Sequence, residues 1–115
     1  MKAIIYGRAH RNDRKLAAQM EKLKNYCQDN GYEVVREVID CCSGNQIGDN
    51  LISLIREPVK DFDTIIVQDP SRISRELVKM LETVRMIRSN GIRLLFTEMK
   101  ELNDPGKRRF NLKIS

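Results

Sequence analysis

The sequence lacks any long hydrophobic run, and this absence bears first on where the protein can reside. No apolar stretch reaches the roughly 18 residues that a membrane-spanning helix needs. The N-terminus, MKAIIYGRAH, carries one lysine and only a short apolar segment, so it does not have the form of a secretory signal peptide. We therefore expect a cytoplasmic protein that does not enter a membrane.

Cysteine and histidine are also scarce. The three cysteines, Cys27, Cys41 and Cys42, are odd in number and have no metal-ligand spacing, and the chain has one histidine, His10. A secreted disulfide scaffold would have more cysteines, usually an even number, and structural zinc needs about four ligands. We expect neither a disulfide framework nor a metal site.

Several phosphate-handling motifs are missing as well. The chain has no G-x-G-x-x-G dinucleotide fingerprint and no Walker glycine loop ending in Lys-Ser or Lys-Thr. A cysteine-dependent phosphatase would need an arginine six residues after its cysteine, but Glu33, Ile47 and Gly48 stand at those positions. A response-regulator receiver would need paired acids after the first strand, where Gly7 and Arg8 stand.

What the sequence does have is the composition of one ordinary globular domain. It has 115 residues, of which 41% are hydrophobic and 32% charged, and this length allows a single domain with its own core. The 21 lysines and arginines against 16 acidic residues give a formal net charge of +5. Such a surplus points only weakly to a polyanionic partner, because the position of the charges matters more than their sum.

Short apolar runs alternate with amphipathic stretches along the chain. The apolar runs predict strands at residues 2–6, 32–39, 63–68 and 92–97. The amphipathic stretches predict helices at about 13–30, 48–59 and 73–90. In the last helix we expect these side chains to face inward: Leu77, Met80, Leu81, Val84 and Ile87. The alternation predicts an α/β fold with a mostly parallel central sheet of four or five strands, flanked by helices on both faces.

In such a sheet, ligands bind beyond the carboxyl ends of the strands. The informative loops are therefore those after the first three strands, at residues 7–14, 40–47 and 69–75. Arg8, Arg72 and Arg75 stand out there, because converging guanidinium groups match the oxygens of a phosphodiester and of its transition state. A single one of these arginines could equally be a solvated surface charge, so the prediction depends on the three together.

Four motifs follow one another in a familiar order. Residues 6–10, Tyr-Gly-Arg-Ala-His, resemble a Y-x-R-V-S opening, and residues 16–23 match L-x-x-Q-x-x-x-L through Leu16, Gln19 and Leu23. Asp40 with Ser43-Gly44 resembles a D-x-x-S-G loop, and residues 71–75, Ser-Arg-Ile-Ser-Arg, resemble a D/S-R-L-S/G-R signature after a strand. Over residues 2–98 the chain thus resembles the N-terminal catalytic domain of the serine recombinases, the resolvase/invertase family.

This resemblance implies a resolvase-like catalytic core at residues 1–98 and a polar C-terminal tail at 99–115. It implies site-specific DNA recombination, as in mobile elements, in which a serine attacks a DNA phosphodiester without metal or cofactor. It also implies a DNA partner and a homodimer or tetramer, because strand exchange needs paired active sites. The catalytic positions carried over are Arg8, Gln19, Asp40, Arg72 and Arg75, and Ser43 joins the three arginines at the substrate.

The chain departs from the family pattern at several positions. The nucleophilic serine falls on His10, and no other serine or threonine lies between Met1 and Asn30. The arginine expected after the D-x-x-S-G loop has no clear counterpart, and Asp49 stands about there. We expect no helix-turn-helix domain in this chain, so its own binding to DNA should be weak and should rest on phosphate contacts.

His10 leaves three interpretations open. The chain is a catalytically silent member, or His10 is a substitute nucleophile that forms phosphohistidine, or the sequence is an atypical version of an active protein. We expect strand cleavage to be absent or severely weakened. Two other functions stay open: a non-catalytic regulatory or interaction module derived from a recombinase, and an unrelated small phosphoryl-handling α/β protein. The last would gain support if Arg8, Arg72 and Arg75 did not converge.

Overall fold

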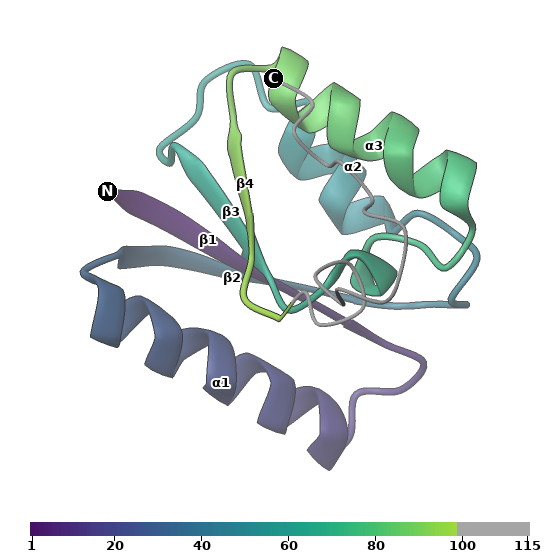
Figure 1. The fold of residues 1–115 in the computed structure, drawn as a ribbon, viewed down its shortest axis with the longest axis horizontal. Coiled ribbons are helices and arrows are strands. Elements are labelled where there is room, and N and C mark those ends of the chain that lie inside the picture. The colour runs from purple at the N-terminus through teal and green to yellow at the C-terminus, as the bar shows by residue number, and fades with distance from the viewer. Residues whose placement is uncertain (99–115) are drawn as a thin grey trace, which may run out of the picture.

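A single sheet of four parallel strands forms the centre of the computed structural model, which describes residues 1–98. The strands are β1 (Lys2–Ala9), β2 (Glu33–Cys41), β3 (Thr64–Val67) and β4 (Arg93–Phe96), in the spatial order β2-β1-β3-β4 (Figure 1). All three strand pairs are parallel, which confirms the predicted sheet. The predicted tail at 99–115 lies outside the described residues.

Helices cover both faces of this sheet, as the alternating sequence pattern predicts. α1 (Arg14–Asn30) packs on one face, while α2 (Asp49–Ile55) and α3 (Leu77–Ser89) pack on the other (Figure 1). A short 3₁₀ helix, η1 (Pro70–Arg72), links β3 to α3. Within residues 1–98, no helix is both long enough and apolar enough to cross a membrane.

The core consists of two layers separated by the sheet. Along β1, Ala3 and Ile5 face α1, whereas Ile4 and Tyr6 face α2 and α3, because successive side chains of a strand point to opposite faces. The central strands β1 and β3 are therefore buried on both sides. This is why they appear in the sequence as continuous apolar runs rather than as an alternation of apolar and polar residues.

α1 agrees with the helix predicted at about 13–30, and both of its ends are capped. The Asp13 side chain accepts hydrogen bonds from the backbone N–H groups of Lys15 and Leu16, which caps the first turn. Gly31 ends the helix with a φ of 75°, in the left-handed region that glycine adopts without steric cost. These two ends fix where the loop after β1 stops and where β2 begins.

Several predicted boundaries are wrong. β1 continues to Ala9 and β2 to Cys41, so Arg8 and Asp40 lie on strands and not in the loops after them. α2 ends at Ile55 rather than near 59, because the residue before Pro58 is disfavoured in a helix.

The third helix also begins later than predicted, at residue 77 rather than 73. η1 occupies residues 70–72, and the Glu76 side chain caps α3 by accepting from the N–H groups of Val78 and Lys79. The prediction that Leu77 faces inward is wrong. Its side chain is 49% exposed, because it stands at the first position of the helix, outside the buried stripe.

Candidate active site

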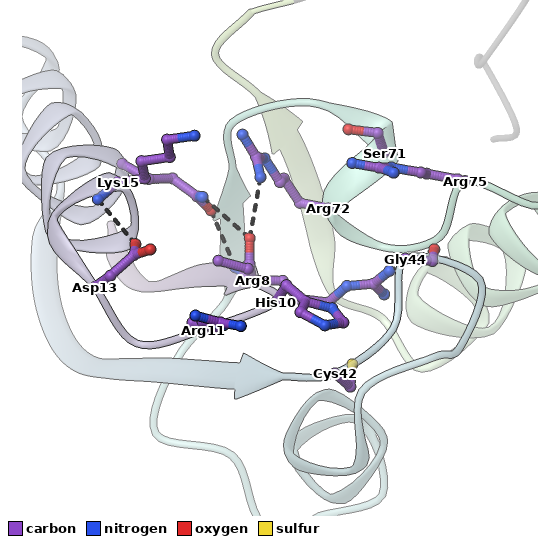
Figure 2. A pocket seen from close by; sticks show the side chains of 12 residues that line it. Arg8, His10, Arg11, Asp13, Lys15, Cys42, Gly44, Ser71, Arg72 and Arg75 are labelled. Carbon is purple, nitrogen blue, oxygen red and sulfur yellow. Dashed lines mark hydrogen bonds between the residues drawn. The ribbon is translucent and has the colours of Figure 1, made fainter.

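A pocket at the carboxyl edge of the sheet gathers the predicted arginines. It has a volume of about 410 Å³ and lies where β1, β2 and β3 pass into the connections that follow them (Figure 2). Arg8, Arg72 and Arg75 all line it, together with His10 and Gln19. The three arginines therefore meet at one place, as the resemblance implies.

Arg8 is buried, with 3% of its surface exposed, and its guanidinium group faces the main chain. Nη1 donates to the carbonyl oxygens of Gln46 and Ile73, and Nη2 donates to those of Ser43 and Gly44, at 2.5–3.1 Å. A guanidinium group has five N–H donors, so these four contacts engage every Nη proton. In this arrangement Arg8 ties the loop after β2 and the end of η1 to β1.

Gln19 holds the backbone of Arg8 from the side of α1. Its Oε1 accepts from the Arg8 N–H at 3.0 Å, and its Nε2 donates to the Arg8 carbonyl at 3.1 Å. The same carbonyl accepts from Nη1 of Arg72 at 3.1 Å (Figure 2). Gln19 is 4% exposed, so it fixes the end of β1 rather than offering its amide to a ligand.

Asp40 is a second buried polar residue, and it caps α2. Its carboxylate accepts from the N–H groups of Asn50 and Leu51, each at 3.0 Å, and from the Tyr6 hydroxyl at 2.7 Å. A carboxylate is favoured at a helix N-terminus, where the first N–H groups have no partner within the helix. Burial, reinforced by the hydrogen bond to Asp40, raises the pKa of Tyr6 well above its usual value.

Gly48 makes this cap possible. A Cβ at this position would overlap the Asp40 carboxylate and the Tyr6 hydroxyl, so only glycine lets the chain pass this close. Gly48 is also the N-cap residue of α2 and has no side chain to serve as a cap. Asp40 supplies from β2 what Gly48 cannot supply itself.

Arg72 and Arg75 differ from Arg8 because their guanidinium groups are less occupied. Arg72 is about one-third exposed, and its Nε lies 3.7 Å from Oδ2 of Asp69 in a loose ion pair. Arg75 is exposed, its N–H donates to the Gly44 carbonyl at 2.8 Å, and its side chain runs beside Gly44. Both side chains reach the pocket from the η1 side (Figure 2).

One imidazole and two further cationic side chains also lie at this pocket. His10 is exposed at the end of β1, and Arg11 and Lys15 line the same pocket. The sequence motifs do not indicate Lys15 as a site residue. Its place in the first turn of α1, close to the capping Asp13, is the one sequence feature that could have indicated it. Of the two acids near the pocket, Asp13 caps α1 and Asp69 accepts hydrogen bonds from the N–H and hydroxyl of Ser71.

The remaining predicted site residue, Ser43, does not line the pocket. Its carbonyl accepts from Arg8, while its hydroxyl accepts from the Asn45 N–H at 3.4 Å. Cys42 does line the pocket, and burial raises the pKa of its thiol, so the thiol is protonated at neutral pH. Within the described part of the chain, no group of three His, Cys, Asp or Glu side chains could hold a metal ion.

Comparisons with known proteins agree with this fold. Residues 3–114 match the family described as Resolvase, N terminal domain. The N-terminal catalytic domain of TP901-1 integrase is 26% identical and has a TM-score of 0.75, and the match covers 84% of this chain and 76% of that chain.

Two further solved structures share the fold. The C-terminal catalytic domain of ISC1926 TnpA, an IS607-like serine recombinase, is 22% identical with a TM-score of 0.77, covering 88% of this chain and 70% of that chain. A resolvase family site-specific recombinase from Streptococcus pneumoniae is 24% identical with a TM-score of 0.68, covering 84% and 71%. Because the family match spans most of the sequence, the protein belongs to the resolvase family and has the fold of a serine recombinase catalytic domain.

Proposed function

We propose that this domain binds a DNA phosphodiester in the pocket of Arg72 and Arg75, and that its strand cleavage is absent or severely weakened. The observation that carries the proposal is that His10 lines this pocket, because the resemblance of residues 6–10 to the family's opening motif places the nucleophilic serine at His10. The protein would act on DNA as a homodimer or tetramer, as members of its family generally do.

The charge of the pocket supports the binding half of the proposal. Arg11, Lys15, Arg72 and Arg75 surround the hollow, while the carboxylates of Asp13 and Asp69 are engaged in helix caps. Arginine forks match phosphate oxygens, and fixed cations stabilise the charge that develops on a reacting phosphoryl group. The buried Arg8, Gln19 and Asp40 would act by holding the three connections in place around this surface.

The side chains that line the pocket support the proposed loss of strand cleavage. Cleavage needs a group that attacks phosphorus, and an imidazole differs from a serine hydroxyl in reach and basicity. The Cys42 thiol is protonated at neutral pH, because burial raises its pKa. Of the lining residues in the described part of the chain, Ser71 alone carries a hydroxyl, and this hydroxyl donates to Asp69. No lining group therefore replaces the serine directly.

Covalent trapping on supercoiled plasmid tests the proposal. The purified full chain should give no protein–DNA adduct after denaturation, whereas H10S should gain one, since it restores the hydroxyl at the family's position. The double variant H10S/R75Q should lose the gain, because Arg75 would no longer stabilise the transition state. Robust adduct formation by the wild-type chain would overturn the proposed impairment.

The chemistry of any adduct would identify its source. An acid-labile phosphoramidate that H10A abolishes would assign the attack to His10, and an acid-stable ester that S71A abolishes would assign it to Ser71. If H10S remains inert while the wild-type chain still binds DNA, a regulatory module derived from a recombinase becomes the better description. Pull-down with an active recombinase would then show whether the two proteins pair.

A further inference from the structure

A second basic pocket lies at the opposite end of the sheet. Arg85 and Arg88 of α3 and Arg93 of β4 line a cavity of about 710 Å³ beside the connection between these two elements. All strands are parallel, so this connection enters β4 at its amino end, whereas the Arg72 and Arg75 pocket follows the carboxyl ends of β1 and β3 (Figure 1). We call this second cavity the α3–β4 pocket.

The arginines of the α3–β4 pocket form no close ion pair with another described residue. Within residues 1–98, none of the three forms an ion pair, whereas Arg36 pairs with both Glu57 and Asp61. Nη1 of Arg93 donates to the Sδ of Met1 at 3.3 Å, and a thioether is a weak acceptor. The carboxylate of Asp63 lies nearby, and its pKa is lowered mainly by a hydrogen bond from Thr64 and also by the charge of Arg93. Three guanidinium groups therefore line one hollow, and residues 1–98 leave most of their hydrogen-bonding capacity unused.

Arg88 adds an observation independent of the charge count. Its Nε is buried and has no hydrogen-bond partner among the described residues. A buried N–H donor without a partner is unfavourable, since it has lost water without gaining an acceptor. The two Nη groups of Arg88 also have no hydrogen-bond partner among the described residues, and they are the donors that an oxyanion in the cavity could engage.

Stabilisation of the C-terminal end of α3 would explain only one of the three arginines. A cation in the last turn of a helix interacts favourably with the partial negative charge there, and Arg88 lies in that turn. Arg85 lies one turn earlier, on the same side of the helix, and Arg93 lies on the strand. The helix end therefore does not explain why three guanidinium groups surround one cavity.

We propose that the α3–β4 pocket binds a ligand with several phosphate groups. Arginine forks pair with phosphate oxygens through two parallel hydrogen bonds, and three such groups suit a ligand with more than one phosphate. The cavity of about 710 Å³ is open to solvent, so a ligand with several phosphate groups can enter it. The phosphates could belong to a free polyphosphate or to a nucleic-acid backbone, and the proposal does not depend on the function proposed above.

Backbone amide shifts of the full chain provide a local measurement. Gly91 and Ile92 line the α3–β4 pocket, so their amide signals should move when sodium tripolyphosphate is added at low ionic strength. The variant R85Q/R93Q changes two exposed side chains and should fold normally, and it should weaken this response at least fivefold. R75Q removes a cation of the other pocket and should leave the response at Gly91 unchanged. K22Q removes an exposed charge of α1 and should also have no effect.

A second titration with a duplex oligonucleotide separates the two sources of phosphate. Movement of the Gly91 and Ile92 amides with tripolyphosphate but not with DNA would support a free polyphosphate as ligand. Movement with both, weakened by R85Q/R93Q, would support the nucleic-acid backbone. The proposal is overturned if neither probe moves these amides, if R85Q/R93Q responds like the wild-type chain, or if polyglutamate binds there more tightly than tripolyphosphate.

Discussion

Arg8 shows how far the role of a single residue depends on its surroundings. Its motif position implies a catalytic guanidinium group, yet every Nη proton is donated to a backbone carbonyl of the connections after β2 and η1. The sequence indicates which arginines line the pocket, because their positions in the motifs and after the predicted strands can be read directly from it. It does not indicate which of them face main-chain carbonyls, because those carbonyls come from residues 35–65 positions away.

Replacing Arg8 should lower the free energy of unfolding, because its guanidinium group binds buried main-chain carbonyls. Arg8→Gln leaves buried carbonyl groups without donors, and we expect a loss of about 3 kcal/mol in the free energy of unfolding. Arg8→Lys should lose nearly as much, because an ammonium group cannot reach four carbonyls that a planar fork serves. Urea unfolding followed by circular dichroism measures both losses.

The exposed Arg11 of the same pocket provides the matched control for Arg8. Arg11→Gln should change the free energy of unfolding by no more than about 0.5 kcal/mol, as is usual for surface positions. If Arg8→Gln were as stable as Arg11→Gln, the bonds of Arg8 to the main chain would not be what holds these connections.

Gly48 and Gly44 should respond to the same substitution in different ways. Gly48→Ala places a methyl group against the Asp40 carboxylate and the Tyr6 hydroxyl, so we expect a loss of about 2 kcal/mol in the free energy of unfolding. Gly44→Ala meets the Arg75 side chain, whose Cδ lies 2.9 Å from the added methyl position, and this long side chain can move aside. Gly44→Ala should therefore weaken DNA binding in a fluorescence assay while leaving unfolding little changed. Equal effects on unfolding would contradict this account.

At the scale of elements, the order and type of strands and helices could be predicted because each depends on local pattern. The two buried central strands appear as apolar runs, and Asp13 and Gly31 mark the ends of α1. The starts of η1 and α3 could not be predicted, since the apolar Ile73 and Leu77 have the spacing of a helix while the Glu76 cap decides where the helix begins. Likewise, the strand positions of Arg8 and Asp40 could not be predicted. These two residues pair with each other, so β1 and β2 continue beyond their apolar residues.

A salt-bridge cluster joins β2 to the connection between α2 and β3, and it should make stability depend on pH. Arg36 donates to both carboxylate oxygens of Glu57, at 2.8 and 3.0 Å, and to Asp61 at 2.9 Å. The hydrogen bonds from Arg36 are the main reason that the pKa of Glu57 lies below its usual value. A carboxyl group with a lowered folded-state pKa stabilises the fold above its unfolded pKa, about 4.3, and this stabilisation is lost as the pH falls through the folded-state pKa.

Arg36→Gln should therefore flatten the acid limb of the stability curve. Because the cluster is partly exposed, we expect the wild-type chain to lose at most about 1 kcal/mol more than the variant as the pH falls from neutral to about 3. Urea midpoints measured across this range give the comparison. Parallel curves for the two proteins would show that the Arg36–Glu57 pair does not govern the acid response.

For the whole molecule, the net charge of +5 acquires a spatial meaning. The cations of the pocket at the carboxyl edge of the sheet, here called the carboxyl-edge pocket, come from β1, from the start of α1 and from the connections after β1 and β3. Those of the α3–β4 pocket come from the other end of the sheet. The composition alone cannot tell whether the basic residues gather in two pockets or are spread evenly over the surface. The parallel sheet separates the two pockets, because the carboxyl ends of all its strands lie at one edge and the amino ends at the other.

This separation can be measured through the salt dependence of binding to duplex DNA. Each phosphate that the protein neutralises releases condensed counterions, so the slope of log K against log salt concentration changes by about 0.9 for each phosphate no longer neutralised. If Arg75 and Arg11 each bind a phosphate, R75Q should reduce the slope by about 0.9 and R11Q/R75Q by about 1.8. K22Q, on the exposed side of α1, should leave the slope unchanged. Fluorescence anisotropy at several salt concentrations provides the slopes. A reduction as large for K22Q as for R75Q would mean that DNA responds to the total charge of the domain rather than to the carboxyl-edge pocket.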